Sequence, residues 1–156
     1  MGEPITQEHL EKYLGWKMSV DSNAERITRA KSGETFPERK EGDGSMHQPG
    51  SGDRMVNAIL RRMDIEARLL PVIEETLDKM ERIERAIYSL KDPFEQEVLM
   101  RRYIDGYVDE EGFYHYKKMK WADVATILYG NDDESHKKAA QRLHDEAIEH
   151  IGEFEF

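Results

Sequence analysis

Apolar residues recur at alternating spacings of three and four through residues 56–87, which spans about five heptads. With Val56 at the first position, eight of the ten seam positions are apolar. The ten are Val56, Ile59, Met63, Glu66, Leu70, Ile73, Leu77, Met80, Glu84 and Ile87. A segment with this pattern forms a long helix whose apolar seam must be covered by another helix. We therefore expect a long helix over residues 54–90, with a kink or break near Leu70 caused by Pro71.

Two partners are open for this seam. Residues 1–32 form an N-terminal arm whose apolar residues also recur at helical spacing, after Thr6 as a capping residue. These apolar residues are Leu10, Tyr13, Leu14, Val20, Ala24 and Ile27. If this arm folds back, it forms a helical hairpin with the long helix. Otherwise residues 54–90 would join two copies of the chain in a homodimeric coiled coil.

The segment between these two helices, residues 33–53, is rich in glycine and charge. It holds Gly33, Gly42, Gly44, Gly50 and Gly52 together with two prolines. Almost no large apolar side chain is available there to offset the entropy of ordering the backbone. We expect a flexible loop, from which several residues can be deleted with little effect on stability.

Residues 91–156 carry a different set of signals, typical of a small helical domain. Asp92 is a good helix cap, Pro93 suits the first helical position, and Gly106 can end the helix in a left-handed conformation. This helix, Pro93–Asp105, is expected to bury Phe94, Val98, Leu99 and Tyr103. Two aromatic stretches around an acidic turn then predict a β-hairpin over Tyr107–Tyr116.

Two further helices are predicted in the last third of the chain. The first, Trp121–Leu128, is short and is followed by a turn that contains Gly130. The second runs from about Asp133 to Ile151. Its expected buried stripe is Ala140, Leu143, Ala147 and Ile151. A short helix, a glycine-containing turn and a longer helix describe a helix-turn-helix. The predicted fold class is therefore all-α, with a small β-hairpin inserted into this unit.

The leading half of the last helix supplies side chains that read DNA. In a helix-turn-helix, this part of the second helix enters the major groove, where Arg and Lys recognise guanine and Gln recognises adenine. The candidate DNA-binding residues are Ser135, His136, Lys137, Lys138, Gln141 and Arg142. Residues 121–156 also contain nine acidic groups against three basic ones, so a protein-binding helix face is the alternative.

Composition and motifs exclude several other classes. The chain has no cysteine, which removes disulfides, thiolate zinc sites and cysteine nucleophiles. Its six histidines show no metal-ligand spacing, and phosphate-binding glycine loops and nucleophile elbows are absent from the sequence. We expect no enzyme, no cofactor and no metal. No apolar run is long enough to cross a membrane, and we expect a cytoplasmic protein.

Leu90 to Ile151 resembles region 4 of bacterial sigma factors. The matching residues are Ser89-Leu90, Glu95, Glu97-Val98-Leu99, Arg101-Arg102-Tyr103-Ile104-Asp105-Gly106, Trp121-Ala122-Asp123-Val124-Ala125, Leu128, Ser135, Arg142-Leu143-His144 and Ala147. With the long helix and the glycine-rich loop before it, the chain resembles the ArpU/RinA-like phage regulators. These small proteins of phages and prophages are described as activators of late or packaging genes.

The resemblance implies a phage-type, sequence-specific transcriptional regulator. Its partners would be double-stranded promoter DNA and host RNA polymerase, in the cytoplasm of a bacterial host. Two alternatives stay open. A small-terminase-like DNA-packaging adaptor also joins a helix-turn-helix to oligomerising helices, and would form a ring of eight or more subunits. A protein-binding, anti-host module would keep the helix-turn-helix fold without binding DNA.

Overall fold

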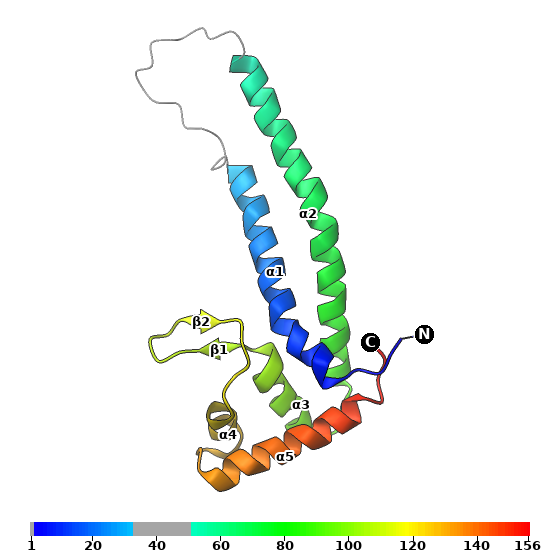
Figure 1. Cartoon of the computed structure of the whole chain (residues 1–156), viewed down its shortest axis with the longest axis vertical. Coiled ribbons are helices and arrows are strands. Elements are labelled where there is room, and N and C mark those ends of the chain that lie inside the picture. The colour runs from blue at the N-terminus through cyan, green and yellow to red at the C-terminus, as the bar shows by residue number, and fades with distance from the viewer. Residues whose placement is uncertain (1, 33–50) are drawn as a thin grey trace. The chain divides into compact units, whose positions relative to one another are not determined.

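A computed structural model describes residues 2–32 and 51–156. For residues 51–53 it describes the helical backbone but not the side chains. The described residues form α1 (Gln7–Ser32), α2 (Ser51–Tyr88), α3 (Pro93–Leu99), a π-helical turn η1 (Met100–Ile104), β1 (Tyr107–Val108), β2 (Tyr114–His115), α4 (Trp121–Tyr129) and α5 (Glu134–Ile151) (Figure 1). The predicted all-α fold with a small β-hairpin is confirmed. None of the helices in the described ranges is long and apolar enough to cross a membrane.

The contacts divide the chain into two compact units. The first, here the terminal unit, joins residues up to Met18 with Thr76–Phe156. The second, here the hairpin unit, is Ser19–Glu75. Both long helices contribute to both units, and each unit has its own contacts between α1 and α2.

The sequence predicted a kink or a break of α2 near Leu70. The helix continues through Pro71, so the break does not occur. Proline removes one backbone donor and leaves the carbonyl four residues earlier without its helical partner. Both Pro71 and Ala67 are exposed, so water can bind the carbonyl of Ala67. The expected loop, 33–53, lies outside the described residues up to position 50. Its last three residues already belong to α2, which begins at Ser51 and ends at Tyr88.

Segments of α1 and α2 pair in each unit, as the predicted helical hairpin requires. In the hairpin unit, Lys31 Nζ lies 3.2 Å from a Glu66 carboxylate oxygen. In the terminal unit, Tyr13 donates a hydrogen bond to Glu84. The buried apolar residues around these contacts are Leu10, Tyr13, Leu14, Ile27, Ala30, Met80, Ile83 and Ile87. Of the α1 apolar residues that recur at helical spacing, Ala24 is exposed and Val20 is half-buried.

The first and last described segments meet in the terminal unit. Pro4 and Glu155 form an antiparallel bridge, and the Phe156 amide donates to the Glu3 carbonyl at 2.8 Å. The Phe156 ring lies against His9, with ring centroids 4.5 Å apart. These contacts hold the end of α5 beside the beginning of α1.

Helices α3, α4 and α5 pack around a small apolar core in the same unit. Asp92 caps α3 as predicted, accepting the Phe94 amide hydrogen at 2.9 Å. The α3 helix passes directly into η1, and the left-handed Gly106, with φ of 80°, follows it. The core residues contributed by these helices are Val98, Leu99, Tyr103, Ile104, Val124, Ala125, Ala140, Ala147 and Ile151.

Phe94 is exposed, contrary to prediction. The inner face of α3 is formed instead by Glu95, Val98 and Leu99, which follow the spacing of three and four. Phe94 precedes that face by one position, so the helix turns its side chain to solvent.

The predicted β-hairpin is present, with Tyr107 opposite His115 and Val108 opposite Tyr114. Its turn is held by Asp109, whose carboxylate accepts hydrogen bonds from the amides of Glu111 and Phe113. Tyr114 lies over Gly106, and Lys17 of α1 donates to its hydroxyl at 3.1 Å. Tyr114 therefore packs on the end of η1 and on α1 rather than along α3.

Candidate nucleic-acid interface

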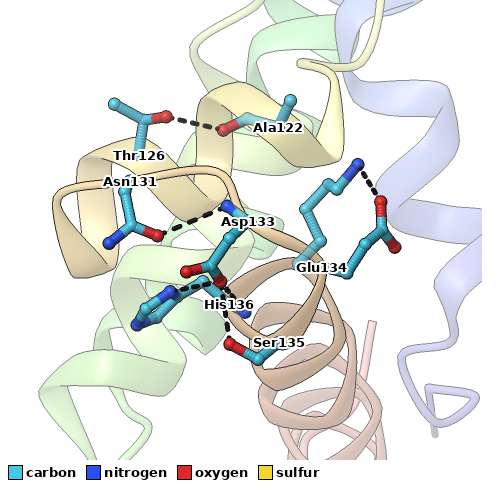
Figure 2. Close-up of polar contacts among 8 residues, drawn as sticks. Ala122, Thr126, Asn131, Asp133, Glu134, Ser135 and His136 are labelled. Carbon is cyan, nitrogen blue, oxygen red and sulfur yellow. Dashed lines mark hydrogen bonds and ion pairs between the residues drawn. The ribbon is translucent and has the colours of Figure 1, made fainter.

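A four-residue connection joins α4 to α5. Gly130 ends α4 in the left-handed region with φ of 88°, and its amide donates to the Thr126 carbonyl at 2.9 Å. Asp133 then takes an extended conformation and accepts the His136 amide hydrogen at 3.0 Å, which caps α5. Asn131 accepts the Asp133 amide hydrogen at 3.3 Å (Figure 2). A short helix, a capped turn and an 18-residue helix make a helix-turn-helix arrangement.

The Asp133 carboxylate gathers the first side chains of α5. Ser135 Oγ donates to it at 2.8 Å, and the His136 ring nitrogen Nδ1 lies 2.6 Å away, as Figure 2 shows. These hydrogen bonds, led by that of the His136 amide, lower the pKa of Asp133 below its usual range. The His136 ring also packs on Tyr129, with centroids 5.4 Å apart. Two of the six predicted DNA-binding residues, Ser135 and His136, thus already make hydrogen bonds to Asp133 of the same chain.

A third candidate, Lys137, is matched by an acid of its own helix. Its ammonium group lies 2.7 Å from a Glu134 carboxylate oxygen, and the side chain is partly covered. The hydrogen bond to Glu134 raises the pKa of Lys137 and lowers that of Glu134. This lysine is therefore paired with Glu134 at the tip of α5.

The remaining candidates, Lys138, Gln141 and Arg142, are all exposed. Positions three and four apart share one helical face, so these three side chains form one cluster. The side chains of Gln141 and Arg142 make no hydrogen bond or ion pair with the described residues. The structure therefore separates the six predicted residues into three that stabilise the helix tip and three that remain available.

The inner face of α5 holds a buried histidine that sequence reasoning missed. His144 Nε2 lies 2.6 Å from the Tyr103 hydroxyl, and Nδ1 lies 3.0 Å from Asp145. Burial raises the pKa of Tyr103 to about 12, so its hydroxyl keeps a proton to donate. Burial also lowers the pKa of His144, which favours the neutral ring. This ring also packs against the Trp121 ring, nearly perpendicular to it, with centroids 5.1 Å apart.

His144 takes the place on the buried stripe that was predicted for Leu143. The buried positions of α5 are Ala140, His144, Ala147 and Ile151, and Leu143 is only partly covered. His144 is four residues after Ala140 and three before Ala147, so its spacing fitted the stripe. The neighbouring Leu143 fits the spacing nearly as well, and leucine is more often buried than histidine, so the pattern alone favours Leu143.

Two further contacts position α4 and α5. The Arg102 guanidinium lies 4.3 Å from the Trp121 ring centroid and donates to the Met119 carbonyl, which fixes the start of α4. Buried Glu95 of α3 forms an ion pair with His150 near the end of α5. This contact raises the pKa of His150. Both pairs join residues far apart in the chain, so sequence spacing carried no signal for them.

The exposed surface of α5 also carries acids. Asp145, Glu146 and Glu149 are exposed on the turns after Arg142. The available positive charge on this helix is therefore confined to Lys138 and Arg142. Among the described residues, no three metal-binding side chains come together.

A scan against models of known protein families finds no match to this chain. Comparisons with curated proteins and with solved structures find none either. The proposed function is therefore based on the geometry of the helix-turn-helix.

Proposed function

We propose that the protein is a phage-type, sequence-specific DNA-binding transcriptional regulator that reads the major groove of promoter DNA with α5. The observation that carries this proposal is the cluster of Lys138, Gln141 and Arg142 on the second turn of α5. Lysine and arginine are residue types that recognise guanine, and glutamine is a type that recognises adenine. The cluster lies directly after a capped helix-turn-helix connection, which is where base-reading residues lie in such proteins.

A helix that contacts bases must also be held in place by the rest of the domain, and packing of the inner face of α5 does this. His144, Ala140 and Ala147 anchor the opposite face of α5 against α3, η1 and α4. Arg142 and Lys138 would contact guanine edges or phosphates, and Gln141 would contact adenine. The small Ala139 beside them lets the helix backbone approach the groove.

The acids around this cluster set the expected strength of binding. Asp133, Glu134, Asp145 and Glu146 repel phosphate, so few counterions are released per complex. We expect weak affinity for the protein alone and a shallow dependence of log affinity on log salt concentration. RNA polymerase bound at the same promoter would supply the rest of the affinity.

Selection of bound duplexes from a random-sequence DNA library tests the proposal. The selected sequence is then used to compare wild type with Lys138→Ala and Arg142→Ala at two salt concentrations. Each variant is expected to lose about 5- to 150-fold in affinity, which corresponds to about 1–3 kcal/mol for a base-reading contact. Arg26→Ala removes an exposed arginine from the hairpin unit and should bind like wild type.

Equal affinity of wild type and both α5 variants would contradict the proposal. So would the absence of an enriched sequence, both for the protein alone and with RNA polymerase present. Either outcome would favour a protein-binding module that keeps the fold. A ring of eight or more subunits in solution would favour a DNA-packaging adaptor instead.

A further inference from the structure

Two lysines on the connection between β2 and α4 lie over the same tyrosine ring. The ammonium nitrogen of Lys117 is 4.9 Å from the centroid of the Tyr107 ring, and that of Lys120 is 5.1 Å from it. Both lysine side chains are exposed, whereas Tyr107 is half-buried. Two positive charges are thus gathered on one neutral ring at the base of the hairpin. These two residues are here called the lysine pair.

The lysine pair forms no ion pair with any residue that the structure describes. Asp109, in the turn of the hairpin, is already paired with His115 at 2.8 Å. Contact with Tyr107 is the main cause that raises the pKa of Lys120, and the exposed acids Asp123 and Glu110 act on it only at longer range. The lysine pair is therefore charged and open to an anionic partner.

Packing places the lysine pair beside the helix that is proposed to read DNA. Lys120 directly precedes Trp121, the first residue of α4. The Trp121 ring packs on His144 of α5, which is buried and follows the exposed Arg142 by two residues. The beginning of α4 thus flanks the part of α5 whose outer side presents Arg142.

The geometry of the major groove gives this position a meaning. The groove is about 12 Å wide, so a helix that occupies it has a strand of phosphates on each side. In a helix-turn-helix, the first of the two helices crosses one of these strands. A flexible lysine side chain at the beginning of α4 is therefore placed toward phosphates rather than toward base edges.

We propose that Lys117 and Lys120 bind the phosphate backbone of the DNA whose bases α5 reads. This inference rests on the proposed function and adds a second contact surface, at the base of the hairpin, to the residues of α5. Phosphates are the same in every sequence, so the lysine pair contributes affinity without specificity. It adds two cations to Lys138 and Arg142, so the number of released counterions stays small.

The double variant Lys117→Gln/Lys120→Gln of the full chain tests the proposal. Its affinity is compared with that of wild type for the selected duplex and for an unrelated duplex of equal length, at several salt concentrations. We expect the affinity to fall by the same factor on both duplexes. The slope of log affinity against log salt concentration should become shallower by about 1–2, because each phosphate contact contributes about 0.9. Arg142→Ala, in contrast, should weaken binding to the selected duplex more than binding to the unrelated one.

Lys118→Gln is the matched control. It removes the same charge from the same connection, but the Lys118 ammonium group already lies 2.9 Å from a carboxylate oxygen of Glu11 in α1. This variant should keep the wild-type affinity and salt slope. Equal helical content of the control and the double variant by circular dichroism shows that both are folded.

The outcomes separate this inference from the proposed function. Wild-type affinity and slope of the double variant, with binding still weakened by Arg142→Ala, would overturn the role of the lysine pair alone. Loss of RNA polymerase binding in that same variant would then assign the pair to an acidic protein surface. A loss confined to the selected duplex, or an equal loss in Lys118→Gln, would overturn the phosphate contact. If wild type binds no duplex, with or without polymerase, both proposals fail.

Discussion

His144 places an ionisable ring inside the apolar core of the helix-turn-helix. Because burial lowers its pKa, the folded protein binds fewer protons at this site than the unfolded chain does. The free energy of unfolding contributed by this histidine is therefore present above the unfolded pKa of about 6.5 and is lost as pH falls below it. Substitution by an uncharged residue of similar shape removes this loss.

We expect His144→Gln to lose less stability than wild type between pH 7.5 and pH 5. Urea unfolding of both proteins at each pH provides the measurement. At pH 7.5 the variant should be the less stable of the two, because the Tyr103 hydroxyl and the Trp121 ring lose their partner. Parallel pH profiles for the two proteins would show that His144 does not titrate as the structure requires.

The pKa of His150 is shifted in the opposite direction to that of His144. Its ion pair with Glu95 raises its pKa, so its stabilising contribution is fully present below about pH 6.5 and is lost as pH rises through the raised value. His150→Gln should therefore reduce the melting temperature more at pH 6 than at pH 8.5. A reduction that is equal at the two pH values would mean that the ion pair contributes nothing through charge.

Leu99 and Leu143 allow a matched comparison of burial. Leu99 is fully buried between the helices, whereas Leu143 is only partly covered. Leu99→Ala is expected to reduce the free energy of unfolding by about 2–5 kcal/mol, and Leu143→Ala by clearly less. Denaturant unfolding of both variants checks the order. A larger loss of unfolding free energy for Leu143→Ala than for Leu99→Ala would show that Leu143 is buried, as the sequence alone predicted.

At the scale of the element, two left-handed glycines end two different segments. Gly106 follows η1 and Gly130 follows α4, and both have φ near 80–88°. An added Cβ at Gly130 meets only open space, so Gly130→Ala should cost about 1–2 kcal/mol for backbone strain alone. At Gly106 the same methyl group would collide with the Tyr114 ring, so the cost should be higher.

The difference between the two alanine variants isolates the contact of the hairpin with η1. Thermal or urea unfolding measures both, and the near-ultraviolet signal of the tyrosines reports whether Tyr114 moves. If Gly106→Ala is no worse than Gly130→Ala, the hairpin is free to shift away from η1, and its packing adds little to the stability of the terminal unit.

Local signals were enough to predict the elements of the terminal unit. Asp92, Pro93, Gly106 and Gly130 act through their own backbone or their nearest neighbours, so their roles could be read from the chain. The hairpin was predictable for the same reason. Which face of α2 becomes covered was not, because a helix with apolar residues on several faces takes its orientation from its partner. The predicted seam through Val56, Met63 and Leu70 is the exposed side.

The candidate site divides in the same way. The six predicted residues on α5 follow from the position of the turn, and their placement on that helix agrees with the structure. Three of them already bind Asp133 or Glu134 at the helix cap. These contacts depend on side-chain geometry, which the sequence does not give. The supporting contacts of Glu95, Arg102 and His144 come from distant parts of the chain and left no spacing to detect.

At the scale of the whole molecule, net charge works against DNA binding. The net charge of −10 repels the phosphate backbone at long range, so contact with DNA depends on local cations such as those of α5. We therefore expect the affinity for DNA to fall only modestly between 50 and 300 mM sodium chloride, because few counterions are released. Affinity measurements at the two concentrations check this expectation.

The carboxylate cap of α5 has one more consequence. Most helix tips attract anions through their free amides, but here Asp133 already occupies that position and Glu134 stands beside it. A DNA backbone cannot anchor at the tip without displacing the protein's own carboxylates. Contact must then begin one turn later, at Lys138, and a nuclease footprint should be narrow. Replacing Asp133 with asparagine would keep the cap, remove the charge and widen the protected region.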